Sequence, residues 1–171
     1  MIHPLVSQLQ FTRSEFARCF EGVPPEDGCR RLGPMNCLSW IVGHLAWQEH
    51  SLWVQVAQGQ NIAPGLRQIA GFQQPASTPS WDEMWASWHA ITKAADVYLC
   101  GLKPEDLNIH FIREGKPIAE DVGTLLLRNI YHYWYHLGKA HAVRQMLGHT
   151  DLPVFVGDMS TVRYALEEWQ K

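Results

Sequence analysis

The sequence predicts an all-α protein that folds as a four-helix bundle. Four long segments carry apolar residues at the three- and four-residue spacing of one helix face, and stretches rich in proline and glycine separate them. The chain has 171 residues, of which 46% are hydrophobic, so it can bury a full core. Because long helices in a small protein bury their apolar faces against one another, we expect one bundle domain spanning residues 1–171.

The first two predicted helices are separated by a segment that we expect to be a loop. The first helix covers residues 4–20. The next segment, GVPPEDGCRRLGP, is rich in proline and glycine, which predicts that it contains no helix. The second helix covers residues 37–58, with Asn36 as its expected N-cap and Gly59 closing it.

A long loop, a third helix and two short extended pieces follow. Residues 59–80 form the longest expected loop, and loops of this length in compact domains often cover or line a binding site. Ser80 and Glu83 have the spacing of a capping box, which starts a helix that runs to about Cys100. The segment NIHFIREGKPIAE predicts two extended pieces around an EGK turn.

The last long helix is expected from Asp121 to Leu147, where Gly148 ends it. After it, the segment LPVFVGD predicts an extended crossing of the bundle. Residues 160–169 predict a short C-terminal helix.

Composition argues against several classes of partner. The net charge is −3 and the basic residues are scattered, which is not the pattern of a nucleic-acid-binding surface. The four cysteines show no Cys-x-x-Cys spacing, so we expect reduced thiols in a cytoplasmic protein. The N-terminal segment lacks the features of a signal peptide, and no segment approaches the ~18 apolar residues of a membrane span. We therefore expect neither a nucleic-acid nor a membrane partner.

Two histidines of the last helix form the first candidate site. His132 and His136 stand four residues apart in the stretch HYWYH. At about 100° per residue they share a face with Leu125 and Val143, so this face is expected to point into the core. Histidines four residues apart lie about 6 Å from each other, a spacing suited to binding one ion. Two ligands are only half of a site, so a third would have to come from another helix.

His44 is the candidate for the third ligand. It shares a face of the second helix with Gln48, and the neighbouring Gly43 allows another backbone to approach closely. Glu49 points to a different side of the same helix, so we do not assign it as a general base. Spacing alone leaves two interpretations open: a three-histidine metal site, or polar side chains on a buried face.

Three stretches resemble the DinB/YfiT-like superfamily: NCLSWIVGHL in the second helix, HYWYHLGK in the fourth, and LGHTDLPVFVG after it. The resemblance implies a four-helix bundle of up-down-down-up topology that holds a divalent metal at His44, His132 and His136. The superfamily includes mycothiol-dependent maleylpyruvate isomerases and proteins thought to be bacillithiol transferases. Similar proteins form dimers through helix faces, so a homodimer is also expected.

Three histidine ligands leave a coordination position open, which is typical of catalytic metal sites. The open position can hold a water, whose pKa zinc lowers to about 7, or a thiolate. We therefore expect a divalent-metal-dependent enzyme, either a hydrolase or an S-transferase that uses a low-molecular-weight thiol. Imidazole suits zinc, nickel, copper and iron alike; we expect zinc or nickel, with iron as an alternative.

Gln48 and Asn129, each one turn from an expected ligand, are candidates to orient a ring nitrogen or a bound water. The alternative interpretation is a non-catalytic bundle, stabilised by a metal or binding a small molecule.

Overall fold

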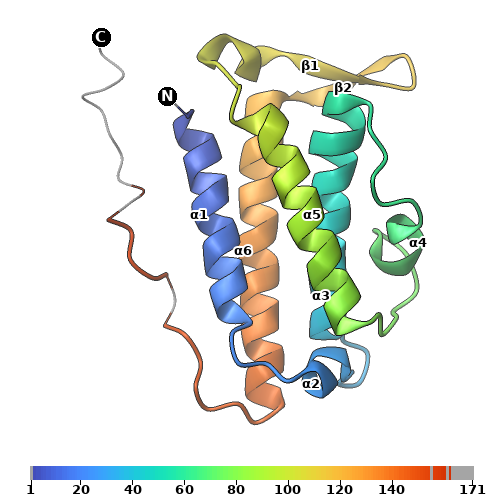
Figure 1. Cartoon of the computed structure of the whole chain (residues 1–171), viewed down its shortest axis with the longest axis vertical. Helices are drawn as coiled ribbons and strands as arrows, with labels where there is room; N and C mark the ends of the chain where they lie inside the picture. The colour runs from blue at the N-terminus through green and yellow to red at the C-terminus, as the bar shows by residue number, and fades with distance from the viewer. Residues whose placement is uncertain (1, 155, 161, 163–171) are drawn as a thin grey trace.

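The computed structural model describes residues 2–154, 156–160 and 162. Figure 1 shows long helices packed side by side, so the protein is mainly helical, as predicted. Along the bundle, α1 and α6 run in one direction and α3 and α5 in the other (Figure 1). The long helices are α1 (Pro4–Cys19), α3 (Leu38–Glu49), α5 (Trp81–Leu99) and α6 (Val122–Met146).

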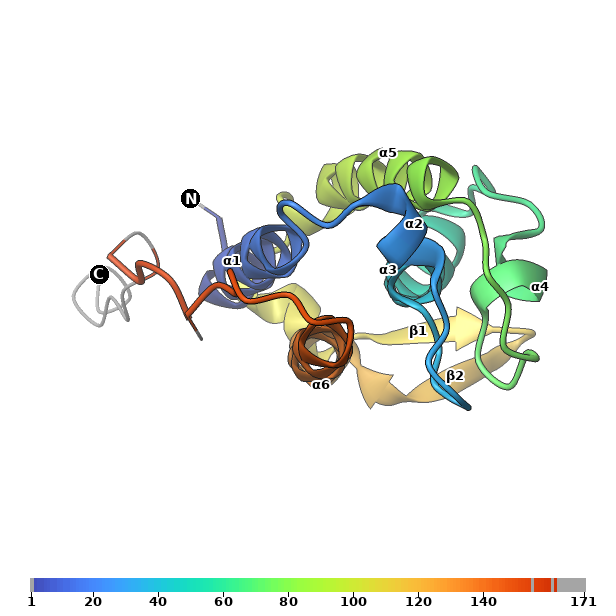
Figure 2. The same cartoon turned by 90° about the horizontal axis from the view of Figure 1, so that it is seen from below.

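Two hydrogen bonds join α3 and the helical turns that continue it to α5 and the loop just before α5. At one end the Ser39 hydroxyl donates to the carbonyl of Pro79 at 2.7 Å. At the other end the Gln58 side chain donates to the carbonyl of Ala94 at 3.0 Å. The two helices are therefore parallel neighbours. Figure 2 shows the bundle from below, along its length.

The predicted Ser80 cap is confirmed, and the structure adds a second side-chain cap at Asp121. The Ser80 hydroxyl accepts from the backbone N–H of Glu83 at 3.4 Å, and the Asp121 carboxylate accepts from that of Thr124 at 2.7 Å. Gly148 has a φ of 88° after the end of α6, a conformation that glycine adopts without strain. These local contacts fix where α5 begins and where α6 begins and ends.

The predicted N-cap of the second helix is wrong. Cys37 occupies the N-cap position of α3, its side chain makes no capping hydrogen bond to a backbone N–H, and the helix starts at Leu38. The Cys37 side chain is buried, and its thiol lies 3.3 Å from the Ser39 hydroxyl. Burial of this side chain in the core thus displaces the cap from Asn36.

Two short helices lie where we expected loops. Helix α2 (Pro25–Cys29) begins with a proline at a position whose N–H needs no partner, and Glu26 and Asp27 occupy its first turn. Helix α4 (Leu66–Ala70) lies inside the 59–80 segment and packs against α3 with Leu66 and Ala70 buried. The expectation of uninterrupted loops was wrong. In α2 the favourable first turn outweighs the nearby glycines and prolines, and in α4 the two buried apolar side chains do so.

The second long helix changes its hydrogen-bond pattern part-way. After Glu49 it continues as the π-helix η1 (His50–Val56) before it ends at Gln58. A π-helix is wider than an α-helix, so side-chain directions derived from a regular helix hold only as far as Glu49.

A hairpin lies across one end of the bundle (Figure 1). The 3-10 helix η2 (Pro104–Asn108) leads into it. Strand β1 (His110–Arg113) pairs antiparallel with β2 (Lys116–Asp121), with Arg113 opposite Lys116. Glu114 and Gly115 between them both have positive φ, as in a type I′ turn. The two extended pieces around an EGK turn are thus confirmed.

Beyond α6 the chain runs back beside α1 (Figure 1). Arg18 donates to the carbonyl of Val154 at 2.8 Å, and the N–H of Gly157 donates to the Glu15 carboxylate at 2.7 Å. These contacts agree with the predicted extended crossing. The short helix expected at residues 160–169 lies outside the described residues, apart from residues 160 and 162.

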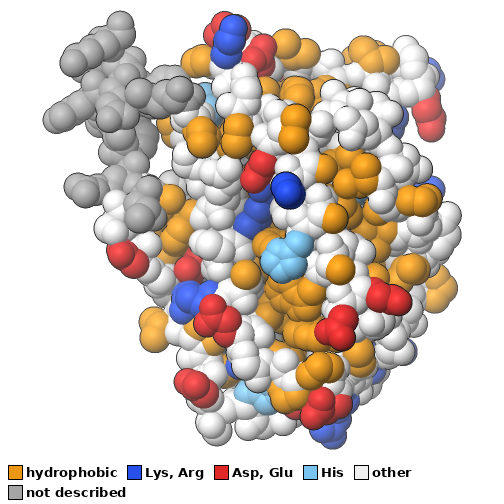
Figure 3. Space-filling model, in the orientation of Figure 1, with side chains coloured by type: hydrophobic (Ala, Val, Ile, Leu, Met, Phe, Trp, Pro, Cys, Tyr) orange, Lys and Arg blue, Asp and Glu red, His pale blue; other side chains and the backbone are white. Residues whose placement is uncertain are grey.

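Charged side chains of both signs are interspersed over the face shown in Figure 3, with apolar side chains between them. Among the helices of the described residues, none combines the length and the apolar character of a membrane span.

Candidate metal centre

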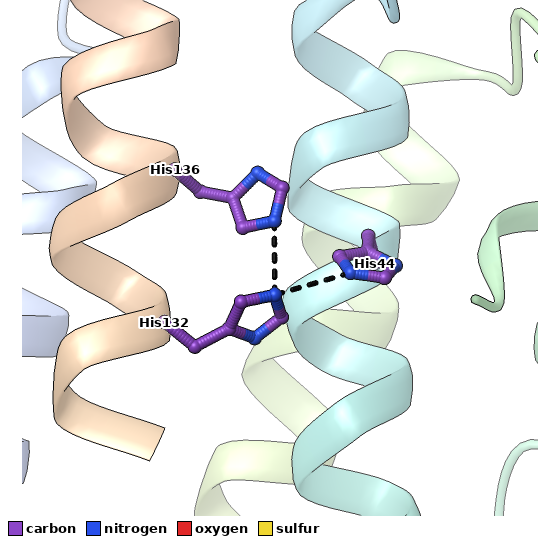
Figure 4. A group of neighbouring side chains, drawn as sticks. All are labelled: His44, His132 and His136. Atoms are coloured by element: carbon purple, nitrogen blue, oxygen red, sulfur yellow. Dashed lines mark hydrogen bonds between the residues drawn. The ribbon is translucent and has the colours of Figure 1, made fainter. Parts of the chain in front are cut away.

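Three histidine rings meet between α3 and α6. His44 projects from α3, and His132 and His136 project from successive turns of α6 (Figure 4). His132 Nε2 lies 3.3 Å from His44 Nε2 and 3.0 Å from His136 Nε2. The possible ligand atoms of the three side chains all lie within 4.8 Å of one another. The structure therefore brings together the three histidines singled out in the sequence.

These separations suit a bound cation. Histidine binds zinc at about 2.0–2.1 Å, so two nitrogens in tetrahedral coordination lie about 3.4 Å apart. The 3.3 Å between His44 and His132 is close to that value, and the 3.0 Å between His132 and His136 needs only a small adjustment. A three-histidine group of this geometry could hold a metal ion.

The proton of the His44 ring is fixed by a backbone contact. His44 Nδ1 lies 2.8 Å from the carbonyl oxygen of Ala70 in α4. A carbonyl only accepts, so Nδ1 carries the proton and Nε2 presents a lone pair to the other histidines. Gly43 permits this contact, because a Cβ there would overlap the Met84 side chain and lie 3.1 Å from the Ala70 Cβ.

A chain of hydrogen bonds fixes the His132 ring in the same way. The indole N–H of Trp53 only donates, and it lies 2.7 Å from Asn129 Oδ1, so Asn129 must turn its NH₂ group toward Gln48. Asn129 Nδ2 donates to Gln48 Oε1 at 3.2 Å. The Gln48 atom that faces His132 Nδ1 is therefore an oxygen, and the ring donates to it. His132 Nε2 is left unprotonated, like that of His44.

Burial favours the uncharged form of all three rings. Desolvation is the largest cause of a lowered pKa at each ring, and the neighbouring positive charges add to it. The pKa of His132 is lowered to about 4 and that of His136 to about 2. His136 Nδ1 is buried without a hydrogen-bond partner among the described residues. Neutral imidazoles are the form that binds metals.

A cavity of about 680 Å³ opens onto His44 and His132. Its lining is mainly apolar, with Trp47, Phe72 and other large side chains. The Trp40 ring stacks against the His44 imidazole, with 4.6 Å between the ring centroids. Within the described part of the chain, no other histidine, cysteine or carboxylate joins the three histidines as a possible ligand.

Glu49 faces away from the histidines, as its place on the helix indicated. It is fully buried, forms an ion pair with Arg13 and accepts a hydrogen bond from Tyr133. Sequence reasoning did not find three contributors to the site: the carbonyl of Ala70, the indole of Trp53 and the ring of Phe72. Each acts through a contact between distant segments, for which a single sequence carries no local signal.

The profile of the DinB superfamily matches residues 8–140. The chain belongs to the DinB superfamily. The match includes helices α3, α5 and most of α6, and therefore all three histidines. The DinB superfamily is metal-binding, which agrees with the histidine cluster. No curated protein compared with the chain matches it.

Proposed function

We propose that this DinB superfamily protein is a divalent-metal-dependent enzyme that acts on a small molecule, with His44, His132 and His136 as the metal ligands. One observation carries the proposal. His44 and His132 point unprotonated Nε2 atoms at each other across 3.3 Å, with His136 beside them. Two lone pairs at that distance repel each other unless a cation lies between them. Zinc or nickel suits three imidazoles, and iron is the alternative.

The cavity favours a catalytic over a purely structural role. Structural zinc sites are closed by four protein ligands, whereas three histidines and an adjoining cavity leave a position for a substrate or water. A divalent ion held there would lower the pKa of a bound water or thiol, which is the chemistry needed for hydrolysis or for thiol transfer.

The protein's own side chains have distinct parts in this proposal. Gln48 and Asn129 hold the His132 ring in the tautomer that binds metal. Trp47, Phe72 and Tyr131 form apolar walls that hold the substrate and exclude water. Arg128 and Glu120 line the same cavity and pair with each other, so neither is an unpaired charge.

The nucleophile in this proposal is water or a low-molecular-weight thiol, and the same three histidines would serve either reaction. Two further expectations belong to the same proposal. One is the up-down-down-up topology, which the helix directions in Figure 1 support. The other is a homodimer.

Metal analysis of the purified protein tests the ligand assignment. We expect about one equivalent of zinc or nickel in the unmodified protein and none in His132→Ala, with the helical circular dichroism largely kept. His89 is an exposed histidine of α5, so His89→Ala is the matched control and should keep the ion. Full metal content in His132→Ala would show that the ligands are wrong. An unmodified protein that takes up no zinc or nickel would favour the non-catalytic bundle.

Activity is tested with the metal-loaded protein and two probes. One is 4-nitrophenyl acetate, for hydrolysis, and the other is cysteine with 1-chloro-2,4-dinitrobenzene, for thiol transfer. The proposal predicts that one reaction is accelerated and that His132→Ala abolishes the acceleration. Equal rates for the two proteins in both reactions would contradict it for these two substrate classes.

A further inference from the structure

A second cavity adjoins the one at the histidines. It has a volume of about 650 Å³, and Trp47 and Phe72 line both cavities. We call the cavity at His44 and His132 the histidine chamber and the second one the polar chamber. The histidine chamber is mainly apolar, whereas the lining of the polar chamber is mainly polar. Two chambers of opposite character therefore meet at a ridge of two aromatic rings.

The polar chamber carries an excess of positive charge. Arg67 and Arg113 line it together with a single carboxylate, that of Glu114. Within the described part of the chain, neither arginine forms an ion pair, and Arg113 donates to the Ser51 hydroxyl at 3.2 Å. The remaining polar lining consists of uncharged groups such as the Gln55 amide. The chamber thus has a net charge of about one positive unit and two unpaired guanidinium groups.

The wall of the polar chamber is held in place by a buried histidine. His50 is only 2% exposed, and its Nε2 accepts from the backbone N–H groups of Ile62 at 3.1 Å and Ala63 at 3.3 Å. These bonds anchor the 59–65 segment to η1. The same π-helix supplies Ser51 and Gln55 to the lining, and π-helical turns occur frequently at functional sites.

The ridge between the chambers is exposed. Phe72 is 63% exposed although its ring lies between two cavities, and the next residue, Gln73, has a φ of 63°. A positive φ is unfavourable for glutamine, so this turn holds Phe72 out from the bundle at a cost in strain. A ligand that lies across the ridge would cover this apolar surface.

We propose that the substrate is a two-part molecule that spans the ridge. Its apolar part lies in the histidine chamber and carries the reacting group, and a carboxylate at its other end binds Arg67 and Arg113 in the polar chamber. A guanidinium group binds a carboxylate through paired, charge-assisted hydrogen bonds. Glu114 offsets one of the two arginine charges, so the chamber keeps a net charge of about one positive unit, which a singly charged carboxylate would neutralise. The position of the reacting group rests on the proposed function, whereas the binding of the carboxylate to the two arginines does not.

Binding of two matched probes tests the inference. The probes are 6-phenylhexanoate and 6-phenylhexan-1-ol, which share an apolar body and differ in the carboxylate. Their affinities are measured by titration calorimetry with the full-length protein stripped of metal, so that the carboxylate has no ion to bind. We expect the acid to bind at least about 10-fold more tightly than the alcohol, because hydrogen bonds between charged groups are stronger than those made by an uncharged hydroxyl.

Variants assign the carboxylate to its chamber. The double variant Arg67→Gln/Arg113→Gln should remove the preference for the acid and leave the affinity for the alcohol unchanged. Arg30→Gln removes a charge from an arginine that lines neither chamber and should leave both affinities unchanged. The inference is overturned if the double variant keeps the preference, if both probes bind the unmodified protein equally, or if the acid does not bind at millimolar concentration.

His132→Ala separates this inference from the proposed function. The variant should keep the preference for the acid, because the carboxylate lies in the other chamber. Loss of the preference in His132→Ala would place the carboxylate at the histidines and overturn the inference, while leaving the metal assignment intact. Conversely, a protein that binds no metal but prefers the acid through its arginines would refute the proposed function alone.

Discussion

The hydrogen-bonding state of His132 depends on side chains outside the three-histidine cluster. Trp53 orients Asn129, Asn129 orients Gln48, and the Gln48 oxygen takes the Nδ1 proton of His132. Each step is forced because an indole N–H only donates and an amide has one donating and one accepting end. A hydrogen bond between two residues that lie 76 positions apart in the sequence thus decides which nitrogen of His132 is unprotonated.

Trp53→Phe tests this chain of hydrogen bonds. Without the indole donor the Asn129 amide is free to turn, and Gln48 no longer presents its oxygen reliably to His132. We expect zinc affinity to fall about 10-fold, the lower end of the 10–100-fold cost of losing such supporting contacts. Imidazole ¹⁵N chemical shifts of the metal-free protein should show a mixture of His132 tautomers.

Trp88→Phe is the matched control. Trp88 is also buried and donates a single hydrogen bond, at 2.8 Å to the Tyr133 hydroxyl, but it has no link to Gln48. Its loss should lower the free energy of unfolding without changing zinc affinity or the His132 tautomer. Equal losses of zinc affinity in the two variants would mean that Trp53 acts only through general stability.

At the scale of elements, the centre depends on how closely α3 packs against α4 and α5. Ala70 in α4 supplies the carbonyl that holds His44, and Met84 in α5 covers Gly43. Glycine weakens a helix interior by roughly 0.5–1 kcal/mol relative to alanine. At Gly43 that cost is offset by the close packing of Met84 and Ala70, which any Cβ at this position would prevent.

Gly43→Ala is expected to destabilise the protein and to weaken metal binding. The added methyl group displaces Met84 and pushes Ala70 away, so the bond from His44 Nδ1 lengthens. Overpacking of this kind costs about 1–3 kcal/mol. Gly138→Ala is the control, since position 138 lies inside α6 with nothing within 4 Å of an added Cβ, and it should raise stability by up to about 1 kcal/mol. Urea denaturation and zinc titration measure both effects, and a harmless Gly43→Ala would contradict the packing argument.

The elements that the sequence predicted well are those governed by local rules. The helical periodicity of the long segments, the Ser80 cap and the turn at Gly115 all depend on residues close together in the chain. Placement of the histidines on inward faces followed from the same periodicity. The residues His44, His132 and His136 do come together, because α3 and α6 are neighbours.

What the sequence did not predict depends on contacts between distant segments or on competing local preferences. The π-helix after Glu49 has no simple sequence pattern, and α4 forms because Leu66 and Ala70 are buried against α3. Glu49 was placed away from the histidines, but its partner Arg13 lies on another helix and could not be identified from spacing.

At the scale of the whole molecule, one buried polar network links all four long helices. Arg13 of α1 binds Glu49 of α3 through Nε at 2.8 Å and Asp96 of α5 at 2.6 Å. Tyr133 of α6 donates to Glu49 at 2.5 Å and accepts from Trp88 of α5 at 2.8 Å. Burial raises the pKa of Tyr133, so its hydroxyl keeps the proton that it donates. The network therefore fixes the relative positions of the helices that carry the histidines.

Glu49→Gln should lower the free energy of unfolding by about 3 kcal/mol, because it leaves the buried Arg13 with only the partly exposed Asp96 as a counter-charge. Zinc affinity of the folded protein should change little, since Glu49 faces away from the rings. The double variant Arg13→Met/Glu49→Leu should recover part of the loss, because it removes the uncompensated buried charge but leaves the Tyr133 hydroxyl without its acceptor. Urea denaturation compares the three proteins, and a double variant less stable than Glu49→Gln would argue for a contribution beyond charge pairing.

The separation of His44 from the other two histidines sets the order of events during biosynthesis. On the ribosome His44 emerges 88 residues before His132, and the nascent chain has no complete trio until α6 has been made and has docked on α3. Metal uptake in our proposal is thus a late step of maturation, carried out by an already folded protein. The ion would enter through the histidine chamber, so the route by which the cell delivers the metal is also the route by which a substrate arrives.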